Sequence, residues 1–198
     1  MSSQPIFPTF DIEGREFSKL LIGHNPFLGG SYMSKARSRL YQETFGEAEA
    51  LERILVKASE MGVRGMLASL ADGFTERLRA AMFGAAEKTG VLLPTIMIVS
   101  KGFEAQFDTY RELNCQVMLV HGQWSDALYV KAENTMQPDF ADALKRIRDG
   151  GFVPAYSTHN AGEVIPAAEA FDAAMVRSPL KWSRIMSPRH IGNMRRSS

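Results

Sequence analysis

Short apolar runs alternate along the chain with longer segments whose apolar residues recur at helical spacing. The apolar runs predict six strands, at residues 20–24, 63–69, 91–100, 116–121, 152–158 and 172–177. The intervening segments predict helices at residues 44–62, 74–90, 103–114, 139–151 and 164–171. A short hairpin, with Glu13-Gly14 at its turn, precedes the first strand.

Two pairs of polar residues mark where helices are expected to begin. Thr44 and Glu47 have the T-x-x-E spacing of a capping box, which predicts a helix start at Thr44. Asn160 and Glu163 form a similar pair before the last helix. The segments after the first and fourth strands are predicted to be long loops, which are uncommon unless functional or disordered. We therefore expect these loops to act as a lid.

The alternation of strands and helices indicates the fold class. Strands that are apolar on both faces and alternate with helices are typical of a parallel sheet covered on both sides. No GxGxxG or P-loop motif follows any predicted strand, which argues against a dinucleotide-binding doubly wound sheet. The pattern favours an α/β fold of the TIM type, a (β/α) barrel with its functional residues at the carboxyl ends of the strands.

The predicted barrel is incomplete. The pattern yields about six β/α units after the N-terminal hairpin, whereas a complete barrel has eight and takes about 250 residues. We predict a partial barrel domain at residues 1–177 and a basic, proline-containing tail at residues 178–198. An incomplete sheet leaves unpaired edge strands, so we expect a homodimer or a poorly soluble monomer.

Composition narrows the class of protein. The chain has 198 residues and a formal net charge of +1, which gives no general attraction to nucleic acid or to an anionic membrane. No stretch approaches the roughly 20 apolar residues of a membrane span, and the N-terminal segment lacks a signal-peptide pattern. The single cysteine, Cys115, excludes an internal disulfide and a multi-cysteine zinc site. We expect a cytoplasmic protein that binds a small molecule, with no nucleic-acid or membrane partner.

Three short motifs occur in the order found in one known superfamily. The stretch GREFSKLLIGHNPFLGGSY precedes a helix and then ASEMGVRGMLAS, in which Ala58 to Val63 form an A-x-x-x-G-[VI] junction. The run VSKGF places Lys101 after one strand, and VMLVHGQW ends the next strand at His121. Over residues 13–124 the chain resembles the aldo-keto reductase superfamily. This resemblance implies a (β/α) barrel, reduction of a small carbonyl compound, and catalytic roles for Lys101 and His121.

The chain departs from that superfamily at the proton donor. The resemblance implies an Asp on the second strand and a Tyr shortly after it, but Leu67 occupies approximately the Asp position. No Tyr occurs between Val63 and Thr109, and the nearest aromatic residue, Phe74, has no proton to give. The resemblance also implies NADP as cofactor, although its usual site lies on the last two barrel strands, which are not seen here.

Polar side chains follow five successive predicted strands. In a barrel these strand ends face one mouth, so the side chains are expected to line one site. The basic segment at residues 34–42 can attract an anionic substrate to the same mouth. Each residue also has a structural interpretation as a turn, a cap, a solvated side chain or core packing. We predict catalytic roles for Lys101, His121, Asp72 and His159, and substrate binding by His24, Asn25, Asn160 and Trp124.

Two alternatives to carbonyl reduction stay open. In the first, His24, His121 and His159, with Asp72, hold a divalent metal ion that activates water in a hydrolase, lyase or isomerase. No H-x-H or H-E-x-x-H motif is present to support that ligand set. In the second, the incomplete barrel is a non-catalytic binding or interaction module.

Overall fold

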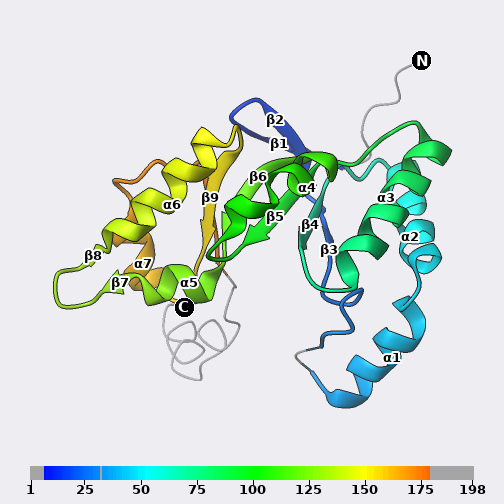
Figure 1. Ribbon diagram of the computed structural model, residues 1–198, viewed down its shortest axis with the longest axis horizontal. Helices are drawn as coiled ribbons and strands as arrows, with labels where there is room; N and C mark the ends of the chain where they lie inside the picture. Colours follow the sequence, from blue (N-terminus) through cyan, green and yellow to red (C-terminus); the bar gives the residue numbers. More distant parts are fainter. Residues whose placement is uncertain (1–6, 32, 179–198) are drawn as a thin grey trace, which may run out of the picture.

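The structure, a computed structural model, describes residues 7–31 and 33–178, which are built around one parallel sheet (Figure 1). Six strands lie in the order β10-β9-β6-β5-β4-β3, and every neighbouring pair is parallel. The sheet curls into an open half-barrel that follows an N-terminal antiparallel hairpin. The predicted α/β class and the incomplete TIM-type barrel are therefore confirmed.

Every predicted strand has a counterpart in this sheet. Most hydrogen-bonded spans are shorter than the apolar runs, because pairing begins only where neighbouring strands overlap in register. The strands are β3 (Ile22–Gly23), β4 (Met66–Ser69), β5 (Thr95–Val99), β6 (Cys115–Val120), β9 (Val153–Ser157) and β10 (Met175–Arg177). The helices between them are α1 (Lys35–Phe45), α2 (Ala48–Glu60), α3 (Phe74–Thr89), η1 (Phe103–Gln106), α4 (Phe107–Glu112), α5 (Gly122–Ala127), α6 (Pro138–Asp149) and α7 (Ala161–Ala168).

Successive strand residues alternate between two apolar cores. On β6, Met118 and Val120 belong to the core that the strands share with the helices. Val117 and Leu119 belong to a second core, on the concave side of the half-barrel. All four side chains are fully buried. Burial on both faces explains why this strand is apolar at consecutive positions.

The helix α6 illustrates how the helices cover the sheet. Pro138 stands in its first turn, where backbone N–H groups have no partner within the helix, so the N–H that proline lacks costs no hydrogen bond. Its buried residues recur at helical spacing, from Phe140 to Ile147. The Phe140 ring meets Tyr156 of β9 edge to face, with ring centroids 5.3 Å apart. One amphipathic face thus fixes the helix against the sheet.

The N-terminal hairpin has the predicted turn. Strands β1 (Thr9–Ile12) and β2 (Arg15–Ser18) are joined by Glu13 and Gly14, whose φ angles are 49° and 79°. Positive φ at both positions is the geometry of a type I′ turn, whose twist matches that of the flanking strands.

This hairpin closes one end of the half-barrel. Ile12 and Phe17 are buried in the concave core, together with side chains of β5, β6 and β9. At the rim, Arg148 of α6 binds both Glu13 of the hairpin and Asp172, which lies just before β10. Figure 1 shows the hairpin at one end of the sheet and α5 (Gly122–Ala127) at the other. The hairpin is the floor of the half-barrel, and the carboxyl ends of the strands form its mouth.

The first long loop contains a helix that was not predicted. Helix α1 begins after Ser34, whose hydroxyl accepts a hydrogen bond from the Arg37 N–H. None of its residues, all of which are described, is buried. A helix without an apolar stripe leaves no periodic signal in the sequence. Thr44 lies inside α1 and donates to the Leu40 carbonyl at 2.6 Å, so the predicted capping box is wrong.

The second long loop is also folded. It contains α5 and a small hairpin of β7 (Tyr129–Val130) and β8 (Thr135–Met136). Leu128 and Met136 are buried in the core between sheet and helices. Side chains of this connection are therefore part of the core, and its role as a lid stays a prediction.

Some expectations are not settled by the described residues. The tail at residues 178–198 lies outside them except for Ser178, and the division at residue 177 stays a prediction. Strands β3 and β10 are the two edges of the described sheet. That a second copy of the chain covers such an edge stays a proposal. No helix in the described ranges is long and apolar enough to cross a membrane.

Candidate active site

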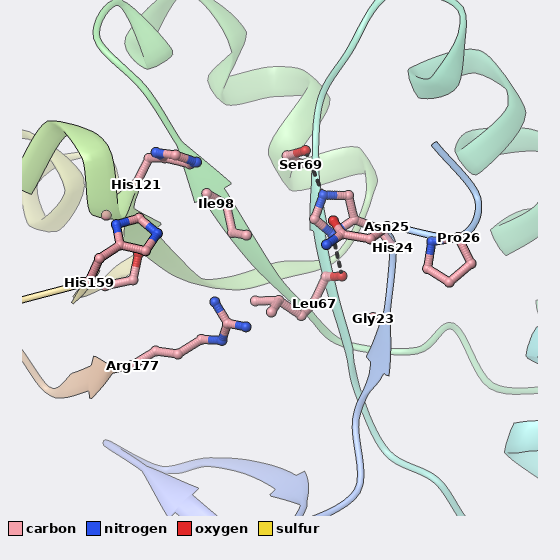
Figure 2. A pocket seen from close by; sticks show the side chains of 12 residues that line it. Gly23, His24, Asn25, Pro26, Leu67, Ser69, Ile98, His121, His159 and Arg177 are labelled. Carbon is pink, nitrogen blue, oxygen red and sulfur yellow. Dashed lines mark hydrogen bonds between the residues drawn. The ribbon is translucent and has the colours of Figure 1, made fainter. Parts of the chain in front are cut away.

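A cavity of about 250 Å³, here called the mouth cavity, lies where the strands of the half-barrel end (Figure 2). It brings together four of the predicted site residues, His24, Asn25, His121 and His159. Figure 2 shows His121 and His159 on one side and His24 with Ser69 on the other. The full lining comprises Gly23, His24, Asn25, Pro26, Leu67, Ser69, Ile98, His121, Gly122, Ser157, His159 and Arg177.

His24 is held in one tautomer directly after β3. Its Nδ1 lies 3.1 Å from the Leu67 carbonyl oxygen, and its Nε2 lies 3.0 Å from the Ser69 hydroxyl. Because a carbonyl oxygen only accepts, Nδ1 carries the proton and Nε2 accepts a hydrogen bond from Ser69. His24 is only 7% exposed, and this burial lowers its pKa below 6.5 despite the opposing effect of the Leu67 carbonyl. His24 is therefore a neutral base at pH 7.

His121 ends β6 and caps the short helix α5. Its Nδ1 accepts a hydrogen bond from the Gln123 backbone N–H at 3.2 Å, so the neutral ring carries its proton on Nε2. Burial lowers the pKa of His121, and the neighbouring His159 lowers it further, while Asp126 opposes both. At pH 7 His121 is a neutral imidazole with one N–H to donate.

His159 follows β9 and is oriented by Asp126 of α5. Its Nδ1 lies 2.9 Å from Asp126 Oδ2, and its backbone N–H donates to the same oxygen at 3.0 Å. The Thr158 hydroxyl donates to the other carboxylate oxygen. Burial opposes ionisation of Asp126, but these hydrogen bonds outweigh burial and lower its pKa. In the neutral ring, the carboxylate therefore holds the proton on Nδ1 of His159, and Nε2 is the hydrogen-bond acceptor.

Gly122 provides the surface against which the His159 ring packs. A Cβ atom at this buried position would lie 2.7 Å from His159 Cε1 and 3.0 Å from Nδ1. Real Cβ atoms do not approach other atoms so closely, so any other residue here would displace the ring. The same Cβ would lie 3.3 Å from the Ser157 hydroxyl, which donates to the Val120 carbonyl. The need for glycine at position 122 thus comes from the ring of His159.

Arg177, at the end of β10, contributes positive charge to the mouth cavity. Figure 2 shows its guanidinium reaching into the cavity toward the side of Leu67. Its charge contributes to lowering the pKa of His24, after the larger effect of burial. A guanidinium beside two neutral imidazoles makes the cavity suited to an anionic group.

A second cavity of about 450 Å³, here called the side hollow, adjoins the first. Ser69, Ile98 and His121 line both. Lys101 lies on the side hollow, so the two residues implied by the reductase resemblance share this space. Tyr110 also lines it, and burial, with a smaller effect of Cys115, raises the pKa of Tyr110 to about 12.

Three predicted site residues lie outside both cavities. Asp72 is an exposed loop residue before α3. Asn160 is also exposed; it stands at the N-cap of α7 and pairs with Glu163 as predicted, but its side chain makes no hydrogen bond to the helix backbone. Trp124 packs toward Phe103 on the helix side, with ring centroids 6.4 Å apart, because α5 turns it away from the mouth.

Sequence reasoning missed three residues of the mouth cavity and its support. Asp126 falls in a segment predicted to be a loop. Ser69 was seen only as a strand end, and Arg177 only as the end of the last strand. Asp126 had no local signal, because its partner His159 follows a different strand, 33 residues further along the chain.

The described residues contain no set of metal ligands. No group of three or more His, Cys, Asp or Glu side chains that could hold a metal ion occurs in these ranges. Both ring nitrogens of His24 already have partners in Leu67 and Ser69. The metal-dependent alternative, which needed three histidines on one ion, therefore has no support from this part of the chain.

The fold and the mouth define an open (β/α) half-barrel with titratable side chains at its carboxyl ends. Among solved structures, the chain is similar to a protein assigned provisionally as 2,5-diketo-D-gluconic acid reductase B, with a TM-score of 0.55 and 17% identity. It is also similar to a thermostable aldo-keto reductase, Tm1743, solved with the inhibitor epalrestat, with a TM-score of 0.55 and 13% identity. These matches cover 93% and 87% of this chain. The resemblance to the aldo-keto reductase fold is confirmed.

The likeness has limits in length and in sequence. The chain spans about 62% of the length of each of these two structures. No protein-family model matches the chain, and no curated protein sequence matches it. At such low identity the likeness shows the fold alone.

The described residues do not fit the nicotinamide cofactor that this fold implies. Strand β10 is the last strand of the described sheet, so no seventh or eighth strand in these ranges offers the usual cofactor site. Leu67, at approximately the position of the superfamily's Asp, is an apolar part of the cavity wall. The usual cofactor site that the resemblance implies therefore has no counterpart among the described strands.

Proposed function

We propose that this chain is an acid–base enzyme of the aldo-keto reductase-like fold that acts on a small carbonyl compound. His121 donates a hydrogen bond to the carbonyl oxygen, and His159, held by Asp126, removes a proton from the adjacent carbon. The observation that carries the proposal is that two imidazoles lining one cavity are held in opposite tautomers, one as donor and one as acceptor.

The donor is suited to the negative charge that develops on the substrate. Proton removal beside a carbonyl leaves an enolate, whose oxygen needs a preorganised hydrogen-bond donor. Because the pKa of His121 is lowered, the ring is neutral at pH 7 and its Nε2–H is available without loss of a proton. The N–H of a neutral imidazole is also closer in acidity to an enol than the N–H of an imidazolium is, so it suits a hydrogen bond to the enolate oxygen.

The acceptor is suited to the proton-removal step. The Asp126 carboxylate fixes the tautomer of His159 and stabilises the imidazolium that forms when Nε2 takes the proton. A well-placed general base contributes roughly 10²–10⁴-fold to a rate. Asp126 is itself held by Thr158, so the pair is oriented before substrate binds.

The mouth cavity also restricts the substrate. Its volume of about 250 Å³ suits a compound of a few carbon atoms. Arg177 supplies a planar guanidinium that can bind a carboxylate or phosphate of that compound through two hydrogen bonds. We therefore expect an anionic carbonyl compound to react faster than a neutral one.

Solvent deuterium exchange tests the proposal without knowledge of the natural substrate. The purified chain is incubated in D₂O with pyruvate or with hydroxyacetone, and loss of the proton signal beside the carbonyl is followed by NMR. We expect exchange above the buffer rate, faster for pyruvate. Exchange at the buffer rate for both compounds would refute the proposal.

Matched variants assign the steps. His159→Ala is expected to slow exchange by about 10²-fold or more, because the general base is lost. The exchange rate of Asp126→Asn should lie between those of the wild type and His159→Ala, because the base His159 remains but its orientation is lost. Asp142→Asn, a matched amide substitution on the exposed face of α6, should exchange at the wild-type rate. Equal exchange rates for Asp126→Asn and Asp142→Asn would count against a catalytic role of the Asp126–His159 pair.

Carbonyl reduction is the second candidate, favoured by one observation. Lys101 and His121, the two catalytic residues that the resemblance implies, line the same side hollow. This function requires Lys101, whereas proton transfer in the mouth cavity does not. Titration with NADPH, followed by the tryptophan fluorescence of the chain and by the fluorescence of the cofactor, separates the candidates. We expect no saturable binding, whereas saturable binding together with activity lost in Lys101→Met would establish the reductase.

A further inference from the structure

A serine and a histidine that the proposed function does not use form a second reactive pair. The Ser69 hydroxyl donates to His24 Nε2 over 3.0 Å, and His24 Nδ1 donates to the Leu67 carbonyl over 3.1 Å. This is a chain of nucleophile, base and orienting acceptor, in which a backbone carbonyl takes the place that a carboxylate often holds. The fixed tautomer points the basic nitrogen at the hydroxyl.

The two members of the pair differ in access to solvent in the way a nucleophile and its base should. His24 is buried, and its lowered pKa keeps Nε2 free of a proton at pH 7. Ser69, at the carboxyl end of β4, is only partly buried and lines both the mouth cavity and the side hollow. Ser157, in the same mouth cavity, donates to the Val120 carbonyl and makes no hydrogen bond to a base among the described residues. The basic partner therefore distinguishes Ser69 from its neighbour.

We propose that Ser69 is a nucleophile, that His24 is its general base, and that the mouth transfers the acyl group of a small ester to water. Ser69 Oγ bonds to the acyl carbon while its proton passes to His24 Nε2. The intermediate collapses, the ester C–O bond breaks, and the departing alkoxide takes that proton as an alcohol. Water then attacks acyl-Ser69 with His24 again as base, which releases the carboxylic acid and restores the hydroxyl.

The developing oxyanion needs a hydrogen-bond donor near Ser69. His121 lines both cavities, as Ser69 does, and its Nε2–H can donate to the oxyanion. The same N–H is the carbonyl donor of the proposed function, so this inference rests on that part of the proposed function. The base of the proposed function, His159, takes no part. The two activities therefore depend on different residues and can fail separately.

Covalent labelling tests the nucleophile directly. The protein is treated with methanesulfonyl fluoride, a small reagent for activated serines, and intact mass and peptide mapping locate the adduct. We expect one equivalent on Ser69, none on this peptide in Ser69→Ala, and wild-type labelling in Ser157→Ala. No adduct on Ser69 of the wild-type protein would overturn the proposal, and this result does not depend on whether any variant folds.

The pH profile separates an activated serine from one that is merely hydrogen-bonded. With His24 as base, labelling should rise through a pKa below 6.5 and be level between pH 7 and pH 8. His24→Gln should slow labelling at pH 7 by at least about tenfold and lose that inflection. A labelling rate that keeps rising with pH, or a wild-type labelling rate in His24→Gln, would show that the hydrogen bond between Ser69 and His24 is only structural.

Ester turnover gives the matching kinetic test. With p-nitrophenyl acetate we expect a burst of nitrophenol that is absent in Ser69→Ala and retained in His159→Ala. Deuterium exchange without labelling of Ser69 would overturn this inference and leave the proposed function standing. Labelling and a burst without exchange would support the nucleophile and remove the proposed function.

Discussion

Replacement of Leu119 by Ala tests whether β6 is covered on both faces. Leu119 is fully buried in the concave core, and in register it lies between Ile98 of β5 and Ala155 of β9. The change removes three carbon groups, each worth about 0.8 kcal/mol of transfer free energy, or about 2.4 kcal/mol together. The cavity left behind adds a further penalty, and strands paired on both sides cannot move in to fill it. We expect a loss of about 3–4 kcal/mol in the free energy of unfolding.

Urea denaturation followed by far-UV circular dichroism measures this loss. The midpoint should fall while the slope with denaturant stays constant. In a chain of this size such a loss lowers the melting temperature by about 10 °C. Leu20→Ala is the matched control, because Leu20 is 49% exposed and its truncation should cost less than about 1 kcal/mol. If the two variants lost equal stability, the two-core description of β6 would be refuted.

Three further predictions follow from the site. Gly122→Ala should reduce deuterium exchange by about tenfold or more, because its Cβ displaces the His159 ring from Asp126; urea denaturation should show little change, since that imidazole is largely exposed and can rotate away. Stability should fall as the pH drops from 6.5 toward the lowered pKa of His24, because the unfolded chain binds a proton that the folded chain excludes; His24→Gln should flatten this slope in urea titrations at stepped pH. Cys115, whose pKa burial raises to about 12, should react with Ellman's reagent only on unfolding, and rapid reaction of the native protein would contradict its burial.

The fold was predictable because runs of consecutive apolar residues mark strands that are buried on both faces. A strand buried on both faces, such as Val117 to Val120, cannot alternate with polar residues, and helices of matching period must cover one of those faces. Parallel strands then carry their carboxyl ends to one edge, which is why His24, His121 and His159 could be placed together. Helix α1 escaped prediction for the opposite reason, since an exposed helix needs no apolar pattern.

The pairing of site residues was less predictable than their placement. Asp126 meets His159 because β6 and β9 are neighbours in the sheet, which brings the segments after them side by side. That adjacency joins two strands separated by α5, a small hairpin and α6, and no local motif records it. Ser69 was overlooked because a serine at a strand end is ordinary. Its reactivity depends on His24, which comes from the preceding strand of the sheet.

The floor of the half-barrel has a consequence for how the chain acquires its structure. Phe17 packs in a core completed by Val153 and Ala155, and Glu13 binds Arg148 at a sequence separation of 135 residues. During synthesis from the N-terminus, the first hairpin is therefore made long before its partners exist. Contacts between such distant segments slow folding, because a long loop must close before they form. The hairpin is therefore expected to dock late, and until then the side chains of Ile12 and Phe17 are exposed to other chains.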